Sequence, residues 1–132
     1  MWLVAEDAKG NVQSTPTKVD VETASDATPP VFAASRTLNV QDFAFDVEVT
    51  ADEPGVTFYV VLSNSAAAPT AAQVRAGSGG SETPVAAGSW TMTISDVASS
   101  TTVSSGIAHS TSYKVYIVAE VCWTVRTWDV LL

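Results

Sequence analysis

The amino-acid sequence predicts an all-β fold, and three observations lead to this prediction. Residues 43–49 (FAFDVEV) and 112–120 (SYKVYIVAE) carry apolar side chains at every second position, which is the period of a strand with one buried face. Turn signals such as Glu53-Pro54-Gly55 lie between the strand-like segments. The chain has no set of paired helical patterns, so the core should form between sheets.

The expected strands follow one another along the whole chain. In order they are Trp2–Glu6, 18–22, 43–49, 56–62, 90–97, 101–105 and 112–120. The segment 43–49 should bury Phe43, Phe45, Val47 and Val49 on one face. The segments 90–97 and 101–105 are rich in Thr and Ser. These residues are a less specific signal for a strand than the alternating apolar residues of 43–49.

One segment departs from the strand pattern. Residues 66–77 (AAAPTAAQVRAG) are rich in Ala, and they predict a short helical turn near 68–76. Pro69 suits the first helical position, and Gly77 suits the stop. The Gly- and Ser-rich residues 77–84 should then form a loop.

Two parts of the sequence resemble each other. Trp2-Leu3-Val4-Ala5-Glu6 matches Tyr116-Ile117-Val118-Ala119-Glu120, and Val19-Asp20-Val21 matches Trp128-Asp129-Val130. The spacing of about 110 residues is the size of one small sandwich domain. We therefore expect three parts: a hairpin at 1–23 formed by the last two strands of a preceding module, a stiff Thr/Pro linker at 24–31, and a complete module at 32–132.

The segment GIAHSTSYKVYIVAE carries a resemblance to a known class of domain. Its Ile107, Thr111 and Tyr113 precede an alternating strand, as in the late strands of fibronectin type III and other immunoglobulin-like modules. This resemblance implies an immunoglobulin-like β-sandwich in which the hydroxyl of Tyr113 bonds to nearby backbone. Residues 1–23 resemble the last hairpin of such modules. Because these modules occur in secreted and surface proteins, the resemblance also implies an extracellular or cell-surface location.

Charge and composition exclude several kinds of partner. The net charge is −8, from 14 acidic and 6 basic residues, and no cluster of Lys or Arg exists. Nucleic acids and anionic membranes bind basic patches, so neither is an expected partner. No apolar run is long enough to span a bilayer, and no signal peptide is visible. Cys122 is the single cysteine, so an internal disulfide cannot form.

No arrangement of residues predicts catalysis or a cofactor. His109 is the single histidine and lies in a predicted turn, where a solvated side chain is the simplest interpretation. One His and one Cys cannot supply a usual zinc site. The carboxylate pairs Asp52-Glu53 and Glu6-Asp7 are adjacent in turns, so their side chains should diverge. We therefore expect a protein that is not an enzyme and that has no cofactor.

Two smaller questions stay open at this point. Asp7, Asn11, Asp20 and Asp26 lie near the module junction, where oxygen ligands could bind calcium, although turn residues are equally expected there. The chain has no N-linked glycosylation sequon. The Thr/Pro stretches are candidates for O-linked sugars, or else an unmodified linker. The candidate positions are Ser14, Thr15, Thr17, Thr28, Pro29 and Pro30.

The hairpin at 1–23 is surplus to the one complete module. Two strands alone are marginal in water, so the hairpin should either fold back or add to a sheet of a neighbouring copy. The expected inter-subunit interface consists of apolar residues at both ends: Trp2, Leu3, Val4, Ala5, Val19, Val21, Trp123, Trp128, Val130, Leu131 and Leu132. The leading hypothesis is a structural subunit of an extracellular filament that polymerises with copies of itself. The alternative is a non-polymerising spacer or adhesive module from a tandem array.

Overall fold

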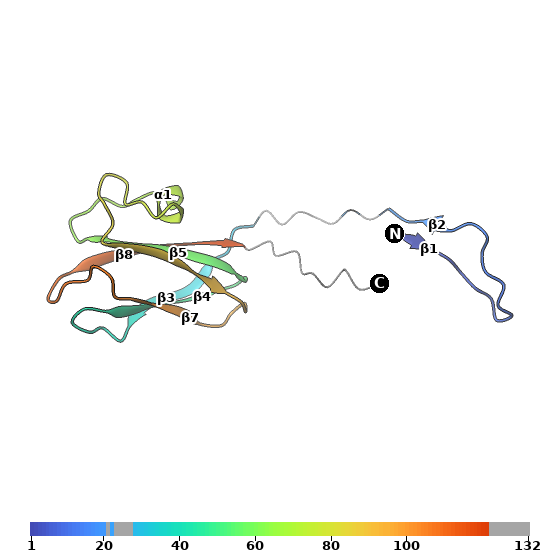
Figure 1. Ribbon diagram of the computed structural model, residues 1–132, viewed down its shortest axis with the longest axis horizontal. Helices are drawn as coiled ribbons and strands as arrows, with labels where there is room; N and C mark the ends of the chain where they lie inside the picture. The colour runs from blue at the N-terminus through green and yellow to red at the C-terminus, as the bar shows by residue number, and fades with distance from the viewer. Residues whose placement is uncertain (21, 23–27, 122–132) are drawn as a thin grey trace.

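The computed structural model describes residues 1–20, 22 and 28–121 of the chain, and it forms eight strands and one short helix in that part (Figure 1). The elements in chain order are β1 (Trp2–Leu3), β2 (Thr17–Lys18), β3 (Phe32–Leu38), β4 (Phe45–Ala51), β5 (Gly55–Ser63), α1 (Ala71–Arg75), β6 (Ala86–Met92), β7 (Ser99–Val103) and β8 (Tyr113–Val121). The prediction of an all-β fold is confirmed. The C-terminal part of the expected module, from residue 122, lies outside the described residues.

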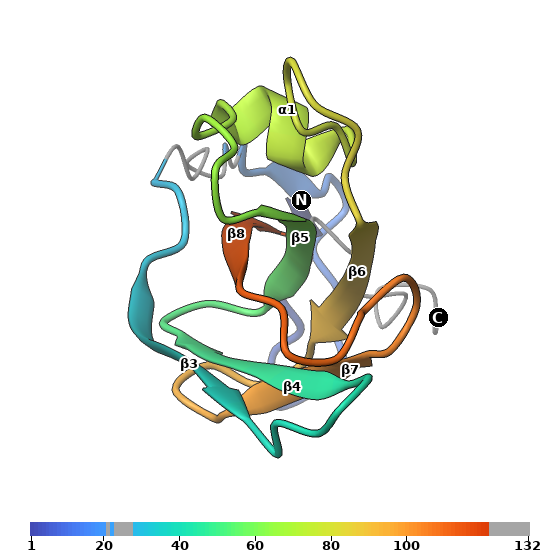
Figure 2. The same ribbon diagram turned by 90° about the vertical axis from the view of Figure 1, so that its left-hand side faces the viewer.

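Three antiparallel sheets hold these strands. β1 and β2 form a two-stranded sheet by themselves, and we call residues 1–20 the hairpin. The other two sheets have three strands each, in the orders β3-β4-β7 and β6-β5-β8. Figure 2 shows these two sheets as facing layers, with α1 on the far side of the second layer.

The core lies between the two three-stranded sheets. Alternate residues of β4, from Phe45 through Val47 and Val49 to Ala51, are buried, as the period-two pattern predicts. Phe45 and Val47 pack with Val61 of β5 and with Val103 of β7, so one cluster contains side chains from both layers. Each fully buried aliphatic side chain stabilises the fold by about 1.5–3 kcal/mol.

The helix is close to its predicted position but begins later. Thr70 is the N-cap: its hydroxyl accepts a hydrogen bond from the N–H of Gln73, whose side chain in turn accepts one from the N–H of Thr70. Pro69 therefore precedes the cap and is not the first helical residue. Gly77 follows the C-cap with a φ of +68°, which suits a residue without a Cβ. Val74 is the buried residue of the helix and lies on its inner face.

Several strand predictions need correction. β3 was not among the expected strands, because its sequence FAASRTL has no clear alternation and five of its seven residues are exposed. The expected strand 90–97 ends at Met92, and the pairing begins earlier, at Ala86. Gly88 allows this early start, since a Cβ there would lie 2.9 Å from the ring of Tyr59. Phe43 precedes β4 and is exposed, so it is not part of the buried face.

Candidate functional site: the hairpin and the open edge of β8

A dense turn holds the hairpin together. The carboxylate of Asp7 accepts hydrogen bonds from the backbone N–H groups of Lys9 (2.8 Å) and Asn11 (3.0 Å), and from the side-chain amide of Asn11 (2.9 Å). These bonds, with those of the Asn11 side chain foremost, lower the pKa of Asp7 below its usual 3.8. Gly10 adopts a φ of +85°, which glycine permits without strain. The turn fixes which residues of the two strands face each other.

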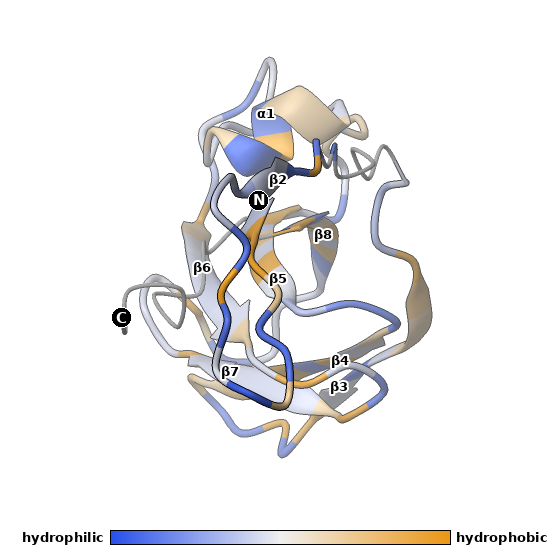
Figure 3. Ribbon diagram, turned by 90° about the vertical axis from the view of Figure 1, so that its right-hand side faces the viewer, coloured by the Kyte–Doolittle hydropathy of each residue, from blue (hydrophilic) through white to orange (hydrophobic). Residues whose placement is uncertain are grey.

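The apolar side chains of the hairpin are exposed. Trp2 is 65% exposed, Leu3 47% and Val4 56%, and every residue from 1 to 20 is exposed. Figure 3 looks at this end of the molecule and shows apolar segments interleaved with polar ones along the hairpin. Two strands cannot bury apolar groups on both faces, so these side chains are available for a contact elsewhere.

The predicted interface residues divide into two groups. Trp2, Leu3, Val4, Ala5 and Val19 all lie on this exposed hairpin. The remaining six lie outside the described residues: Val21, Trp123, Trp128, Val130, Leu131 and Leu132.

The strand β8 lies at the edge of its sheet. Among the described residues it pairs with β5 alone, over nine residues from Tyr113 to Val121. Tyr113, Val115 and Ile117 pack towards the other sheet, whereas Tyr116 and Val118 pack on the side of α1. Apolar residues on both faces are typical of a strand that is covered by another layer on each side. A long apolar edge presents unpaired backbone groups to which another strand can add.

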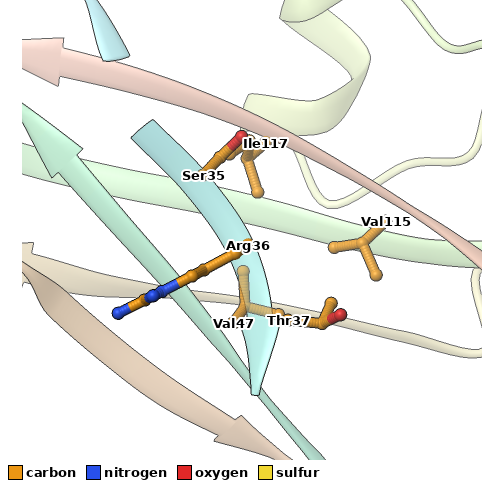
Figure 4. Close-up of a pocket in the computed structure, with 6 residues that line it drawn as sticks. All are labelled: Ser35, Arg36, Thr37, Val47, Val115 and Ile117. Atoms are coloured by element: carbon orange, nitrogen blue, oxygen red, sulfur yellow. The ribbon is translucent and has the colours of Figure 1, made fainter. Parts of the chain in front are cut away.

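A cleft separates β8 from β3. Its walls are Ser35, Arg36, Thr37, Val47, Val115 and Ile117, around a volume of 160 Å³. Figure 4 shows Val115 and Ile117 of β8 across from the β3 residues, with the guanidinium of Arg36 pointing away. That guanidinium contacts Glu48 at 2.6 Å. An adjoining hollow of 150 Å³ shares Thr37 and Val115 and extends past Phe45 and Tyr113. We call the two hollows together the β3–β8 cleft.

The opposite side of the sandwich is closed. The indole N–H of Trp90 on β6 donates a hydrogen bond to the hydroxyl of Ser99 on β7, at 3.1 Å. Gly106 lies so near Val85 that a Cβ would meet the Val85 carbonyl oxygen at 2.6 Å. The two sheets are thus bridged on the β6–β7 side, whereas the β3–β8 side has room for further chain.

The other face of β8 is also hollowed. A volume of 250 Å³ lies between α1 and β8 and is lined mainly by apolar groups, including Phe58 and Val118. Arg75 of α1 contacts Glu120 through two hydrogen bonds of 2.7 Å each, which ties the helix to the end of the strand. A strand placed against the outer edge of β8 would therefore find apolar surface on both faces.

Ile107, Thr111 and Tyr113, the residues that carry the immunoglobulin-like resemblance, lie at the entry to β8, with Tyr113 as its first residue. The hydroxyl of Tyr113 accepts a hydrogen bond from the backbone N–H of Ala108 at 3.0 Å. Thr111 donates to the carbonyl oxygen of His109, also at 3.0 Å, and Ile107 packs against the core cluster. These contacts fix the direction in which the chain enters β8.

The candidate glycosylation residues are accessible for the most part. Ser14, Thr15, Thr17, Thr28 and Pro29 are exposed, and Pro30 is half-buried.

His109 and the acidic turn residues make contacts within the described part of the chain. His109 stacks edge-on against Phe43, with ring centroids 5.9 Å apart. Within 1–20, 22 and 28–121, no group of three or more His, Cys, Asp or Glu side chains could hold a metal ion. Asp7 and Asn11, considered above as calcium ligands, bond to each other. No helix in this part of the chain has the length and apolarity for a membrane crossing.

Comparison with protein-family models, with curated proteins and with solved structures found no match.

Sequence reasoning identified the hairpin but missed the cleft. The cleft needs β3 and β8, which are some 75 residues apart in sequence, and β3 was not expected. A signal for the open edge did exist: residues 115–119 (VYIVA) are apolar on both faces. Such a run indicates a strand that is covered on both faces, so a strand added at its edge would meet apolar surface.

Proposed function

We propose that this protein is a structural β-sandwich subunit that assembles head-to-tail into an extracellular filament. In this proposal the sandwich is immunoglobulin-like, and the hairpin of one copy adds to the sandwich of the next. One observation carries the proposal: the chain combines an exposed apolar hairpin with a long apolar strand, β8, at a sheet edge. Strand addition couples such parts through main-chain hydrogen bonds, with side-chain pockets supplying specificity.

The geometry of such a contact favours an open polymer. The hairpin and the β8 edge are different surfaces, so their contact is heterologous, and each copy has one of each. Such contacts form a ring or continue into a filament. Pro29 and Pro30 lie between the hairpin and β3, and proline holds the backbone extended. An extended spacer disfavours a fold-back of the hairpin onto its own β8.

The contact must be apolar rather than electrostatic. Copies with a charge of −8 repel one another, so charge as a whole opposes assembly. Burial of Trp2, Leu3 and Val4 would contribute about 1.5–3 kcal/mol each to association, before the ordering costs of assembly. The exposed Ser and Thr of the hairpin loop, Ser14 and Thr15, are the proposed sites of O-linked sugars, for which an unmodified intact mass would be contrary evidence.

The test compares the intact chain with a version lacking residues 1–22. Sedimentation velocity and electron microscopy should show filaments of the intact chain and monomers of the truncated one. Leu3→Asp should act like the truncation. Ile94→Asp is the matched control, because Ile94 is 60% exposed but lies outside the hairpin and the cleft, and it should still assemble. Filaments of the truncated chain, or monomers of the intact one, would contradict the proposal.

A second candidate function is a spacer module in a covalent tandem array. The sequence match between residues 2–6 and 116–120 favours it, because tandem modules repeat the same strands. Under this candidate the outer edge of β8 is covered from within its own chain, and the intact protein stays monomeric at every concentration.

A further inference from the structure

We infer that Asp52 is a positioning residue, which holds the end of the Thr/Pro linker against the sandwich and so keeps the hairpin pointing away from its own sandwich. Asp52 lies directly after β4, in the turn that leads to β5. The consequence for assembly rests on the proposed function, whereas the contact itself lies wholly within the described residues. We call the two hydrogen bonds between Asp52 and Val31 the junction clamp.

Both backbone groups of Val31 bond to Asp52. The carboxylate of Asp52 accepts a hydrogen bond from the N–H of Val31 at 2.7 Å. The N–H of Asp52 donates to the carbonyl oxygen of Val31 at 3.1 Å. Because hydrogen bonds are directional, two of them on either side of one residue fix its orientation, whereas a single bond would let the linker pivot.

The side chain of Asp52 does the work of a backbone carbonyl. In an antiparallel ladder, the two residues of a hydrogen-bonded pair exchange both N–H···O bonds through their backbones. Beyond the first pair of the β3–β4 ladder, which joins Phe32 and Ala51, the acceptor for the N–H of Val31 is a carboxylate oxygen. Asp and Asn side chains commonly take over such bonds where regular structure ends. The last bond of this ladder therefore depends on the residue type at position 52.

The two prolines of the linker make Val31 the point of attachment. Pro29 and Pro30 have no N–H, so Val31 is the first residue after them whose backbone can donate a hydrogen bond to the sandwich. Proline also holds φ near −65°, so the direction fixed at Val31 continues through an extended Pro-Pro step. Val31 is 58% exposed. Its backbone bonds, rather than burial of its side chain, therefore hold it in place.

The part of the sandwich beneath the junction clamp is firmly packed. Ala51, the neighbour of Asp52, is buried in a cluster with Met92 of the other sheet, and Phe32 packs against this cluster. The carbonyl oxygen of Ala51 accepts a hydrogen bond of 2.8 Å from the N–H of Asp96, in the loop between β6 and β7. The clamp is thus attached to a base that is itself bonded to both sheets.

The direction of the linker matters for assembly. Figure 1 shows the hairpin beyond one end of the sandwich, along the long axis of the molecule. A hairpin that turned back could bury its apolar side chains on its own sandwich and would then be lost to a neighbour. The apparent affinity of a protein falls with the fraction of molecules in the competent state. The junction clamp raises that fraction without touching the neighbouring copy.

Distances between two spin labels test the clamp in the monomer. The labels are attached at Thr15→Cys in the hairpin and Ser95→Cys in the β6–β7 loop, both exposed positions, with Cys122→Ser to remove the native thiol. At concentrations too low for assembly, Asp52→Ala should broaden the distance distribution and extend it to shorter values. Asp52→Asn removes the same charge but keeps an oxygen that can accept the bond, so it should match the unaltered chain.

A matched control separates the clamp from a general effect of charge. Asp42→Ala removes a carboxylate from the exposed loop between β3 and β4 and should leave the distances unchanged. Equal distributions for the unaltered chain and Asp52→Ala would overturn the inference. Broadening of the same size by Asp42→Ala, or by Asp52→Asn, would overturn it too, because loss of charge and not of the bond would then loosen the junction.

Assembly tests the consequence of the clamp. Asp52→Ala should raise the protein concentration needed for filaments by a factor of about two to ten, and Asp52→Asn should not. Circular dichroism at the same temperature checks that the sandwich is folded in each variant. Altered label distances with an unchanged assembly threshold would overturn the link between the clamp and assembly. Absence of filaments in the unaltered chain would reject the proposed function, while the label distances would still decide whether the clamp holds the linker.

Discussion

Two stretches of this chain with similar sequences have opposite environments. Tyr116-Ile117-Val118-Ala119 forms part of β8, pairs with β5 and packs on both faces of its sheet. Trp2-Leu3-Val4-Ala5 has one short partner strand and is exposed throughout. The sequence therefore specifies a strand in both places, but the neighbouring layers decide whether its side chains are buried. The hairpin has the sequence pattern of a buried strand, but no second layer covers its apolar side chains in the described part of the chain.

The sharpest way to break this comparison is to truncate the same side-chain position in both stretches. Ile117→Ala removes apolar contacts with two core clusters and should lower the free energy of unfolding of the sandwich by about 2 kcal/mol, near the low end for aliphatic truncations because Ile117 is half-buried. Leu3→Ala should change it by less than about 0.5 kcal/mol. Urea denaturation of both variants, at concentrations too low for assembly, measures the difference. Equal losses would show that the hairpin packs on the sandwich.

Tyr113, the first residue of β8, bonds through its hydroxyl to the backbone of the preceding loop. Tyr113→Phe deletes the hydroxyl that accepts a bond from Ala108, and it should destabilise the sandwich by about 1 kcal/mol. Thermal unfolding of the variant checks this value. Assembly at temperatures well below the transition should be unaffected, and an unchanged melting temperature would mean that the bond does not fix the entry to β8.

Salt separates an apolar contact from an electrostatic one. A rise in ionic strength from about 0.01 M to about 0.1 M shortens the Debye length from about 30 Å to about 10 Å. Repulsion between copies of charge −8 should weaken as salt is added, so filaments should form at a lower protein concentration. Light scattering across a salt series measures this. Dissolution by salt would indicate that ion pairs hold the copies together.

The smallest expected effect is the loss of stability at low pH. The pKa of Asp7 in the hairpin is lowered by its bonds to Asn11, and that of Asp46 in the sandwich by its bonds to Thr102 and Asn39. A folded-state pKa below the unfolded value adds stability above about pH 4, and that stability is lost as the pH falls through the folded pKa. NMR titration should give both carboxylates a pKa below 3.8. Asp7→Asn should remove the acid sensitivity of the hairpin turn and leave that of the sandwich.

The sequence predicts the strands in which apolar residues recur at every second position. The alternation in 43–49 and 112–120 reflects side chains that point into the core between the two facing sheets. β4 and β8 form from these segments. β3 escaped prediction because it is an exposed edge strand whose pairing partner, and not its own pattern, holds it in place. The β3–β8 cleft escaped for a related reason: it depends on how two strands far apart in sequence are brought together, which local periodicity does not encode. The hairpin was predictable because it repeats a pattern found elsewhere in the chain.

Amide hydrogen exchange along β8 tests the central claim most directly. In filaments of the intact chain, the N–H groups of β8 that point away from β5 should be protected, because they bond to the hairpin of the next copy. In the chain lacking residues 1–22 they should exchange quickly, whereas the N–H groups of β8 that bond to β5 should stay protected in both. Equal protection of the two sets of amides in the truncated chain would contradict the account, since the edge of β8 would then be covered from within its own chain.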